Sequence, residues 1–148
     1  MGSTKELQKP DKDLYGIERG KIVWHFVCNG FECVIRSMGT HPCCYVFLKG
    51  GDPFVNVTNY DDVDIEMHGG CTFVASAKDF RKKLNLTTLV PSRTVIGWDY
   101  AHCGDMIFSP FSTPIYDERY WTKKELIDEI ENVTESLLLI KRWRRVYE

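Results

Sequence analysis

The first half of the chain contains runs of β-branched and aromatic residues separated by short polar breaks, a pattern that predicts strands. Residues 22–28 and 31–38 are two such runs, and Asn29-Gly30 lies between them. An Asn-Gly pair flanked by two apolar runs indicates a two-residue hairpin turn. We therefore expect the two runs to pair as antiparallel strands.

Apolar and acidic residues alternate over residues 62–67, and this period of two predicts a half-buried strand. Its buried side would consist of Val63, Ile65 and Met67. Its other side would carry Asp64, Glu66 and, at the next position, His68. Further strands are expected over residues 45–48, 71–75 and 94–98, with extended chain over 54–58 and one helical turn or a loop over 78–86.

The C-terminal region has the pattern of a long amphipathic helix. Thr122 and Glu125 have the spacing of a capping box, which marks the start of a helix. Apolar residues then recur at helical spacing, at Leu126, Ile130, Val133, Leu137 and Ile140. We expect this apolar stripe to cover one face of a sheet. Its alternative role is contact with a partner helix or with a second copy of the chain.

These elements predict an α+β fold, an antiparallel β-sheet with one long C-terminal helix packed on it. The 148 residues are enough for one domain, which we place over residues 21–148. Residues 1–20 have a weak pattern and are expected to form a flexible N-terminal arm.

Composition and charge exclude several classes of protein. A net charge of −2 gives no reason to expect general binding to nucleic acid or to an anionic membrane. No apolar run approaches the roughly 20 residues that span a bilayer, and the N-terminus lacks the apolar core of an export signal. We therefore expect a cytoplasmic location, where the six cysteines would be free, mostly buried thiols. Structural zinc and a reactive thiol are the alternatives.

Three histidines lie in short polar segments that contain glycine. His102 lies between Asp99 and Asp105, directly after a predicted strand, and a carboxylate beside an imidazole is the basic unit of acid–base catalysis. His68 precedes two glycines, and His41 precedes a proline. The same side chains can also bind a divalent metal. In the structural alternative, the aspartates only cap backbone amides of a loop.

Familiar catalytic motifs are absent from the sequence. There is no GxxxxGK[ST], no GxGxxG after a strand, no HExxH and no GxSxG. P-loop hydrolysis, Rossmann redox chemistry, zincin proteolysis and α/β-hydrolase chemistry are therefore disfavoured.

The segments GTHP (39–42), YDDVDIEMHGGCTF (60–73) and IGWDYAHCGD (96–105) together resemble a group of small uncharacterised bacteriophage proteins. In that group the pattern looks like GHP, HGGxT(F/Y) and GxDxAHxGD, followed by a C-terminal helix. The matching positions are His41, His68, Gly69, Gly70, Thr72, Asp99, His102, Gly104 and Asp105. The chain departs from the group between residues 43 and 60. The resemblance implies a phage-encoded accessory protein that acts in the host cytoplasm against a host defence, with a nucleotide second messenger as the common target.

The sequence leaves three functional hypotheses. We favour hydrolysis of a small phosphorylated or nucleotide signal, with His102, Asp99, Asp105 and His68 as the catalytic residues. Ligand contacts would come from His41, Trp98, Tyr100, Thr72, Gly69 and Gly70. The alternative is a sponge that binds the signal unaltered, with Arg36, Arg81 or Arg93 as cationic donors. The third is a protein–protein inhibitor of a host enzyme, which needs no pocket.

Overall fold

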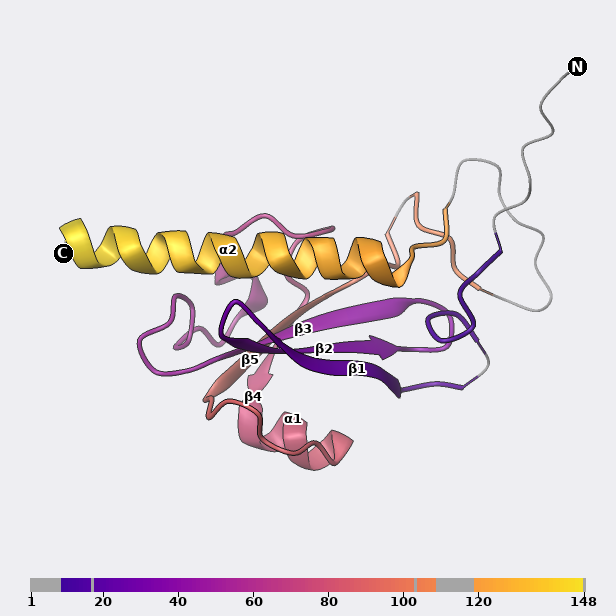
Figure 1. Cartoon of the computed structure of the whole chain (residues 1–148), viewed down its shortest axis with the longest axis horizontal. Helices are drawn as coiled ribbons and strands as arrows, with labels where there is room; N and C mark the ends of the chain where they lie inside the picture. The colour runs from indigo at the N-terminus through magenta and orange to yellow at the C-terminus, as the bar shows by residue number, and fades with distance from the viewer. Residues whose placement is uncertain (1–8, 17, 103, 109–118, 148) are drawn as a thin grey trace, which may run out of the picture.

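Five strands form one antiparallel sheet in the computed structural model of this chain, within the residues that it describes: 9–16, 18–102, 104–108 and 119–147 (Figure 1). Their order in the sheet is β1-β2-β3-β5-β4. The strands are β1 (Lys21–Cys28), β2 (Phe31–Ser37), β3 (Pro42–Leu48), β4 (Phe73–Ser76) and β5 (Thr94–Asp99). The expected α+β class is confirmed.

The predicted hairpin between β1 and β2 is confirmed. The two strands pair antiparallel, with Cys28 opposite Phe31 at the turn. Both turn residues have positive φ, 51° at Asn29 and 82° at Gly30. Positive φ at both central positions defines a type I′ turn, the turn that Asn-Gly favours because its twist matches that of the strands.

Two helices cover opposite faces of the sheet (Figure 1). The long helix α2 (Lys123–Tyr147) buries Leu126, Ile130 and Val133 against one face. The short helix α1 (Ala77–Leu84) packs Phe80 against the other face, beside Tyr45. Because successive side chains of a strand point to opposite faces and both faces are covered, the central strand β3 is buried at every position.

Side chains cap the start of both helices, and the cap of α2 is the one that the sequence predicts. At the start of α2, the Thr122 hydroxyl accepts from the Glu125 amide at 3.3 Å, and Glu125 accepts from the Thr122 amide at 3.1 Å. This is the predicted capping box. In α1, the Ser76 hydroxyl accepts from the Asp79 amide, and Asn85 ends the helix with a φ of 54°. The segment expected as one helical turn or a loop is therefore a capped helix of eight residues.

The predicted strand over residues 62–67 is wrong, although its burial pattern is correct. A 3-10 turn spans Tyr60–Asp62, and the chain that follows pairs with no described strand. Val63 and Met67 are nevertheless buried, and they join the core cluster that includes the inner side of α2. Alternate burial arises here because irregular chain lies against the core, without the hydrogen-bond ladder of a sheet.

The expected extended chain over residues 54–58 is also wrong. Residues 53–56 form turns, in which Val55 donates to Asp52 at 3.4 Å and Val57 donates to Phe54 at 3.2 Å. Phe54 itself has a φ of 66°. The chain turns sharply after β3, and these turns override the strand propensity of residues 54–58.

Part of the expected flexible arm packs into the core. Leu14 and Tyr15 are fully buried in the cluster beneath α2. The Tyr15 hydroxyl accepts from the Trp121 amide at 2.9 Å. The expectation of a loose arm is therefore wrong for this stretch, while residues 1–8 and 17 lie outside the described chain.

The described cysteines agree with the expectation of free, mostly buried thiols. Cys33, Cys43, Cys44 and Cys71 are buried as free thiols, and Cys28 is half-buried. Burial raises the pKa of the Cys43 thiol to about 12, which makes it a poor nucleophile at neutral pH. Cys103 lies outside the described residues. No described helix has the length and apolar character needed to cross a bilayer.

Candidate functional site

The polar segments singled out by the sequence meet at the C-terminal end of β5. Asp99 ends this strand and pairs with Cys43, so the start of β3 lies beside it. The Tyr100 amide donates to the Pro42 carbonyl at 3.1 Å, and the Phe108 amide donates to the Thr40 carbonyl at 2.9 Å. Sheet register therefore brings the loops around residues 40, 70 and 100 together.

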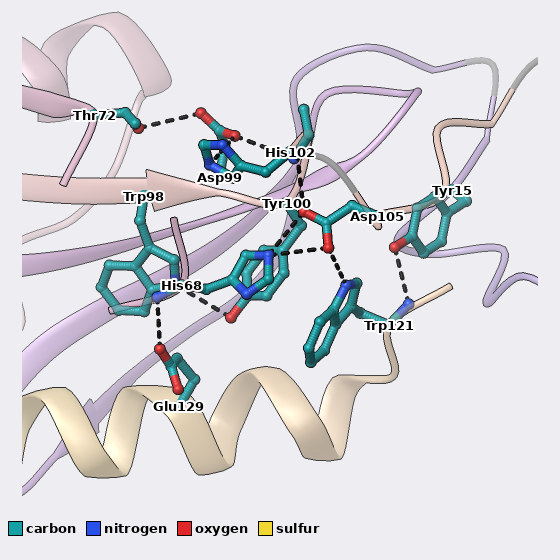
Figure 2. Close-up of polar contacts among 11 residues, drawn as sticks. Tyr15, His68, Thr72, Trp98, Asp99, Tyr100, His102, Asp105, Trp121 and Glu129 are labelled. Atoms are coloured by element: carbon teal, nitrogen blue, oxygen red, sulfur yellow. Dashed lines mark hydrogen bonds and ion pairs between the residues drawn. The ribbon is translucent and has the colours of Figure 1, made fainter. Parts of the chain in front are cut away.

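Asp105 is the buried centre of this cluster (Figure 2). Its carboxylate accepts from Nε2 of His68 at 2.8 Å, from the His102 amide at 3.0 Å and from Nε1 of Trp121 at 2.8 Å. An ionised carboxylate only accepts hydrogen bonds, so His68 holds its proton on Nε2 toward Asp105. Nδ1 is then the ring nitrogen available to take a proton from elsewhere.

Aromatic rings fix the orientation of His68. Its imidazole stacks on Tyr100 with 4.5 Å between ring centroids, and it meets Trp121 edge-on at 4.8 Å. Its backbone amide donates to Glu129 of α2 at 2.7 Å. A quarter of the side chain stays exposed, at 25%. His68 is therefore held rigidly while one edge remains open.

The expectation that Trp98 and Tyr100 contact a ligand directly is wrong. Both side chains are buried to within 1% of full burial, and Nε1 of Trp98 donates to the Tyr100 hydroxyl at 3.2 Å. Burial raises the pKa of Tyr100 far above its usual value, so its hydroxyl stays protonated. Tyr100 therefore supports the His68 ring that stacks on it, and Trp98 holds Tyr100 in place.

Asp99 and His102 form a second, more exposed pair. Nε2 of His102 lies 3.2 Å from Oδ1 of Asp99, with 34% and 27% of the two side chains exposed. Asp99 also accepts from the Thr72 hydroxyl at 3.2 Å and from the Ala101 amide at 3.1 Å. The angle at His102 is not that of a hydrogen bond, so Nε2 has no well-aligned partner within the described chain. Thr72, expected to contact ligand, instead orients Asp99.

Glycine permits the approach of His102 to the turn after His68. Gly70 donates to the Met67 carbonyl at 2.8 Å, and Gly69 occupies the third position of this turn with a φ of 69°. A Cβ on Gly69 would lie 2.2 Å from Nε2 of His102. Neither position tolerates an ordinary side chain without strain, because Gly70 also has a positive φ, of 82°. Both glycines expected at the site therefore shape it through the backbone.

His41 lies at the margin of the cluster and is half-buried. The Thr40 hydroxyl lies 2.8 Å from its Nδ1. Desolvation lowers the pKa of His41, and the nearby charges of Asp99 and Asp105 oppose that shift. A lowered pKa keeps the ring neutral at pH 7, a form that accepts a proton or a ligand hydrogen bond.

The two histidine–carboxylate pairs lie side by side. The ring centroids of His68 and His102 are 5.8 Å apart, with planes at 65°. Two groups that each contact one reacting centre at about 3 Å lie at most about 6 Å apart. The two imidazoles are therefore close enough to serve as proton donor and proton acceptor to one small ligand group.

The sequence left a divalent metal open as an alternative to acid–base chemistry at these residues. Asp105 accepts a hydrogen bond from His68. Asp99 lies beside His102 and accepts a hydrogen bond from Thr72. Across the residues described, no three His, Cys, Asp or Glu side chains are arranged to hold a metal ion.

The cations expected for an anion sponge lie elsewhere. Arg81 pairs with the buried Glu32, Arg93 donates to Asn56 at 3.3 Å, and Arg36 donates to the Gly20 carbonyl at 3.4 Å. Sequence reasoning missed Arg119, whose guanidinium lies 3.8 Å from the Trp121 ring centroid. It also missed Arg19, whose charge contributes to the lowered pKa of His41.

A cavity of about 600 Å³ opens beside His68, between residues 66–69 and α2. Its lining is acidic, with Glu66, Glu129 and Glu135 among the lining residues. Sequence reasoning did not place α2 at the site, because nothing in the spacing of Glu129, or of Trp121 just before the helix, distinguishes them from ordinary residues of a helix and its start.

Comparisons with protein-family models, with curated proteins and with solved structures found no match to this chain. The resemblance to the phage proteins stays a prediction.

Proposed function

We propose that this protein hydrolyses a small phosphorylated or nucleotide ligand by acid–base catalysis at His68 and His102. The observation that supports the proposal is that each imidazole lies beside its own carboxylate, with the two rings 5.8 Å apart; His68 is hydrogen-bonded to Asp105, and Nε2 of His102 lies 3.2 Å from Asp99 without hydrogen-bond alignment. A carboxylate partner fixes the tautomer of an imidazole and stabilises its charged form. Two such pairs supply a base and an acid at one site.

In the proposed reaction, Nδ1 of His68 takes a proton from the attacking water while Asp105 stabilises the imidazolium that forms. The oxygen of that water bonds to phosphorus as the bond to the leaving oxygen breaks. His102, protonated and supported by Asp99, gives its proton to the leaving oxygen. The products are a phosphate monoester or phosphate and a free hydroxyl, and the two histidines then exchange protons with water.

Two arginines provide positive charge for an anionic ligand. Arg119 lies over Trp121, which contacts both His68 and Asp105, and its guanidinium also pairs with Glu125. Arg19 lies close enough to His41 to affect its pKa. Guanidinium groups bind phosphate oxygens through paired hydrogen bonds. The neutral His41 ring supplies a further contact to the ligand.

The resemblance to the phage proteins suggests the biological setting. We propose a counter-defence role in the host cytoplasm, with a nucleotide immune signal as substrate. Cyclic dinucleotides and cyclic ADP-ribose isomers are the candidate ligands, because each combines phosphate groups with a small nucleotide frame.

The test is incubation of the purified protein with these ligands, with and without EDTA, followed by mass spectrometry of the products. General acid–base groups contribute roughly 10²- to 10⁴-fold to rate, so His68→Gln and His102→Gln should each reduce turnover by that order. His25→Gln is the matched control, because His25 pairs with Glu32, away from the cluster.

Recovery of every ligand intact would rule out hydrolysis of these compounds. If intact ligand is instead released from the protein by heat, the protein is a sponge. If His102→Ala leaves the defence-inhibiting activity unchanged, the protein acts through a surface and not through this site.

A further inference from the structure

The outer face of α2 carries an unpartnered apolar stripe near its C-terminal end. Leu139, Trp143, Val146 and Tyr147 are each between 60% and 73% exposed. Their spacing of four, three and one residues places them on one side of the helix. Figure 1 shows these last turns extending beyond the end of the sheet, where no described element covers them. Contiguous exposed apolar surface of this kind marks an interaction site.

Charge is segregated along the same outer face. Asp128, Glu131 and Glu135 are exposed toward the N-terminal half of α2, and Arg142 and Arg145 are exposed toward its C-terminal end. A second α2 that runs antiparallel and crosses near Leu139 would place Arg142 and Arg145 of each helix near Glu135 and Glu131 of the other. This charge complementarity identifies a second copy of the chain as the occupant.

The positions along the helix allow a symmetric crossing near Leu139. Arg142 lies three residues after Leu139, and Glu135 lies four residues before it. At 1.5 Å per residue these offsets are about 4.5 and 6 Å, so Arg142 of one copy lies opposite Glu135 of the other. Trp143 has the same offset as Glu135, and it therefore also reaches that part of the second helix.

The acidic cavity beside His68 lies next to this crossing point on α2. Its wall on α2 includes Asn132, Glu135, Ser136 and Leu139. We propose that α2 pairs antiparallel with α2 of a second copy, so that Trp143 and Arg142 of each subunit cover the acidic cavity beside His68 of the other. The dimer would close one side of the site, and it stands independently of whether the site hydrolyses a ligand.

The first test is the mass of the full chain in solution, measured by sedimentation velocity over a wide range of concentration. We expect a species of twice the 17.2 kDa of one chain. Arg142→Glu and Glu135→Arg should each shift the protein to the monomer mass, because each places like charges together. The double variant should restore the dimer. Lys124→Glu is the matched control, because Lys124 lies on the same helix roughly 22 Å from Leu139.

A second test locates the crossing point. Leu139→Cys should form a disulfide between the two copies under mild oxidation, and Lys124→Cys should not. These positions are exposed, so circular dichroism should show that all variants keep the fold.

Three results would overturn the proposal. The first is a monomer at every concentration, and the second is a dimer that the charge reversals leave unchanged. The third is a monomer that binds vesicles of phosphatidylcholine and phosphatidylserine and loses this binding in Trp143→Glu. That result would assign the basic and aromatic face to a membrane surface.

Discussion

Replacing Gly69 by alanine tests the geometry of the site with few assumptions. The added Cβ would lie 2.2 Å from Nε2 and 2.7 Å from Cε1 of His102. Gly70→Ala is a matched control, because Gly70 has a similar φ, 82° against 69°, but nothing lies within 4 Å of its Cβ position. The two variants therefore share the backbone strain and differ in the collision with His102.

The expected loss of folding stability follows from the backbone strain and from the collision with His102. A side chain in the left-handed region costs roughly 1–2 kcal/mol, and both variants should lose about that much stability. Atoms in normal contact lie about 3.5–4.0 Å apart, so Gly69→Ala must displace the His102 ring by roughly 1.5 Å. That displacement breaks the half-exposed contact to Asp99, which is worth at most about 1 kcal/mol. The two free energies of unfolding should thus differ by no more than about 1 kcal/mol.

The site itself should distinguish the variants clearly. Urea unfolding gives the stabilities, and side-chain NMR of the imidazoles reports the position of His102. We expect the His102 resonances to move in Gly69→Ala and to stay in place in Gly70→Ala. If His68 and His102 catalyse hydrolysis together, only Gly69→Ala should lose turnover.

A double-mutant cycle completes the test. In a His102→Ala background the collision is gone, so alanine at either glycine should cost the same. The reasoning fails if Gly69→Ala leaves the His102 resonances unmoved, or if its excess cost persists when His102 is absent.

Four further predictions concern the interior and the helix start. Asp105→Asn places an NH₂ donor among three N–H donors, so urea unfolding should show a loss of roughly 2–4 kcal/mol. Burial alone would raise the pKa of Glu32, but hydrogen bonds from Arg81, the Val90 amide and His25 lower it below 4.5. Its stabilisation is complete above about pH 4.5 and is lost as the pH falls through the lower folded-state pKa, and Glu32→Gln should flatten this acid limb of stability. Desolvation lowers the pKa of His41 below 6.5, so an NMR titration should give a midpoint under that value, and the stabilisation from its neutral ring should be lost as the pH falls through that midpoint. Thr122→Ala removes the cap of α2 and should lower the midpoint of thermal unfolding, at a cost of about 1 kcal/mol.

Local sequence patterns predicted most of the fold because they reflect which side chains are buried. The Asn29-Gly30 turn, the strands around it and the amphipathic helix from Thr122 all depend on residues adjacent or one helical turn apart. The error at residues 62–67 shows the limit of such patterns. A period of two requires alternate side chains to be buried, and irregular chain lying on the core meets that requirement without pairing to another strand.

The sequence by itself determined that histidines, aspartates and glycines gather in two short motifs, and that a sheet and a covering helix hold them. It left open whether Asp99 or Asp105 would orient His102. The tertiary structure decided that Asp99 pairs with His102 and that Asp105 pairs with His68, 37 residues away in the chain. It also brought Trp121 and Glu129 of the helical region to the site. Partners so far apart in sequence meet only through strand register and helix packing, and no local spacing of residues specifies either of these.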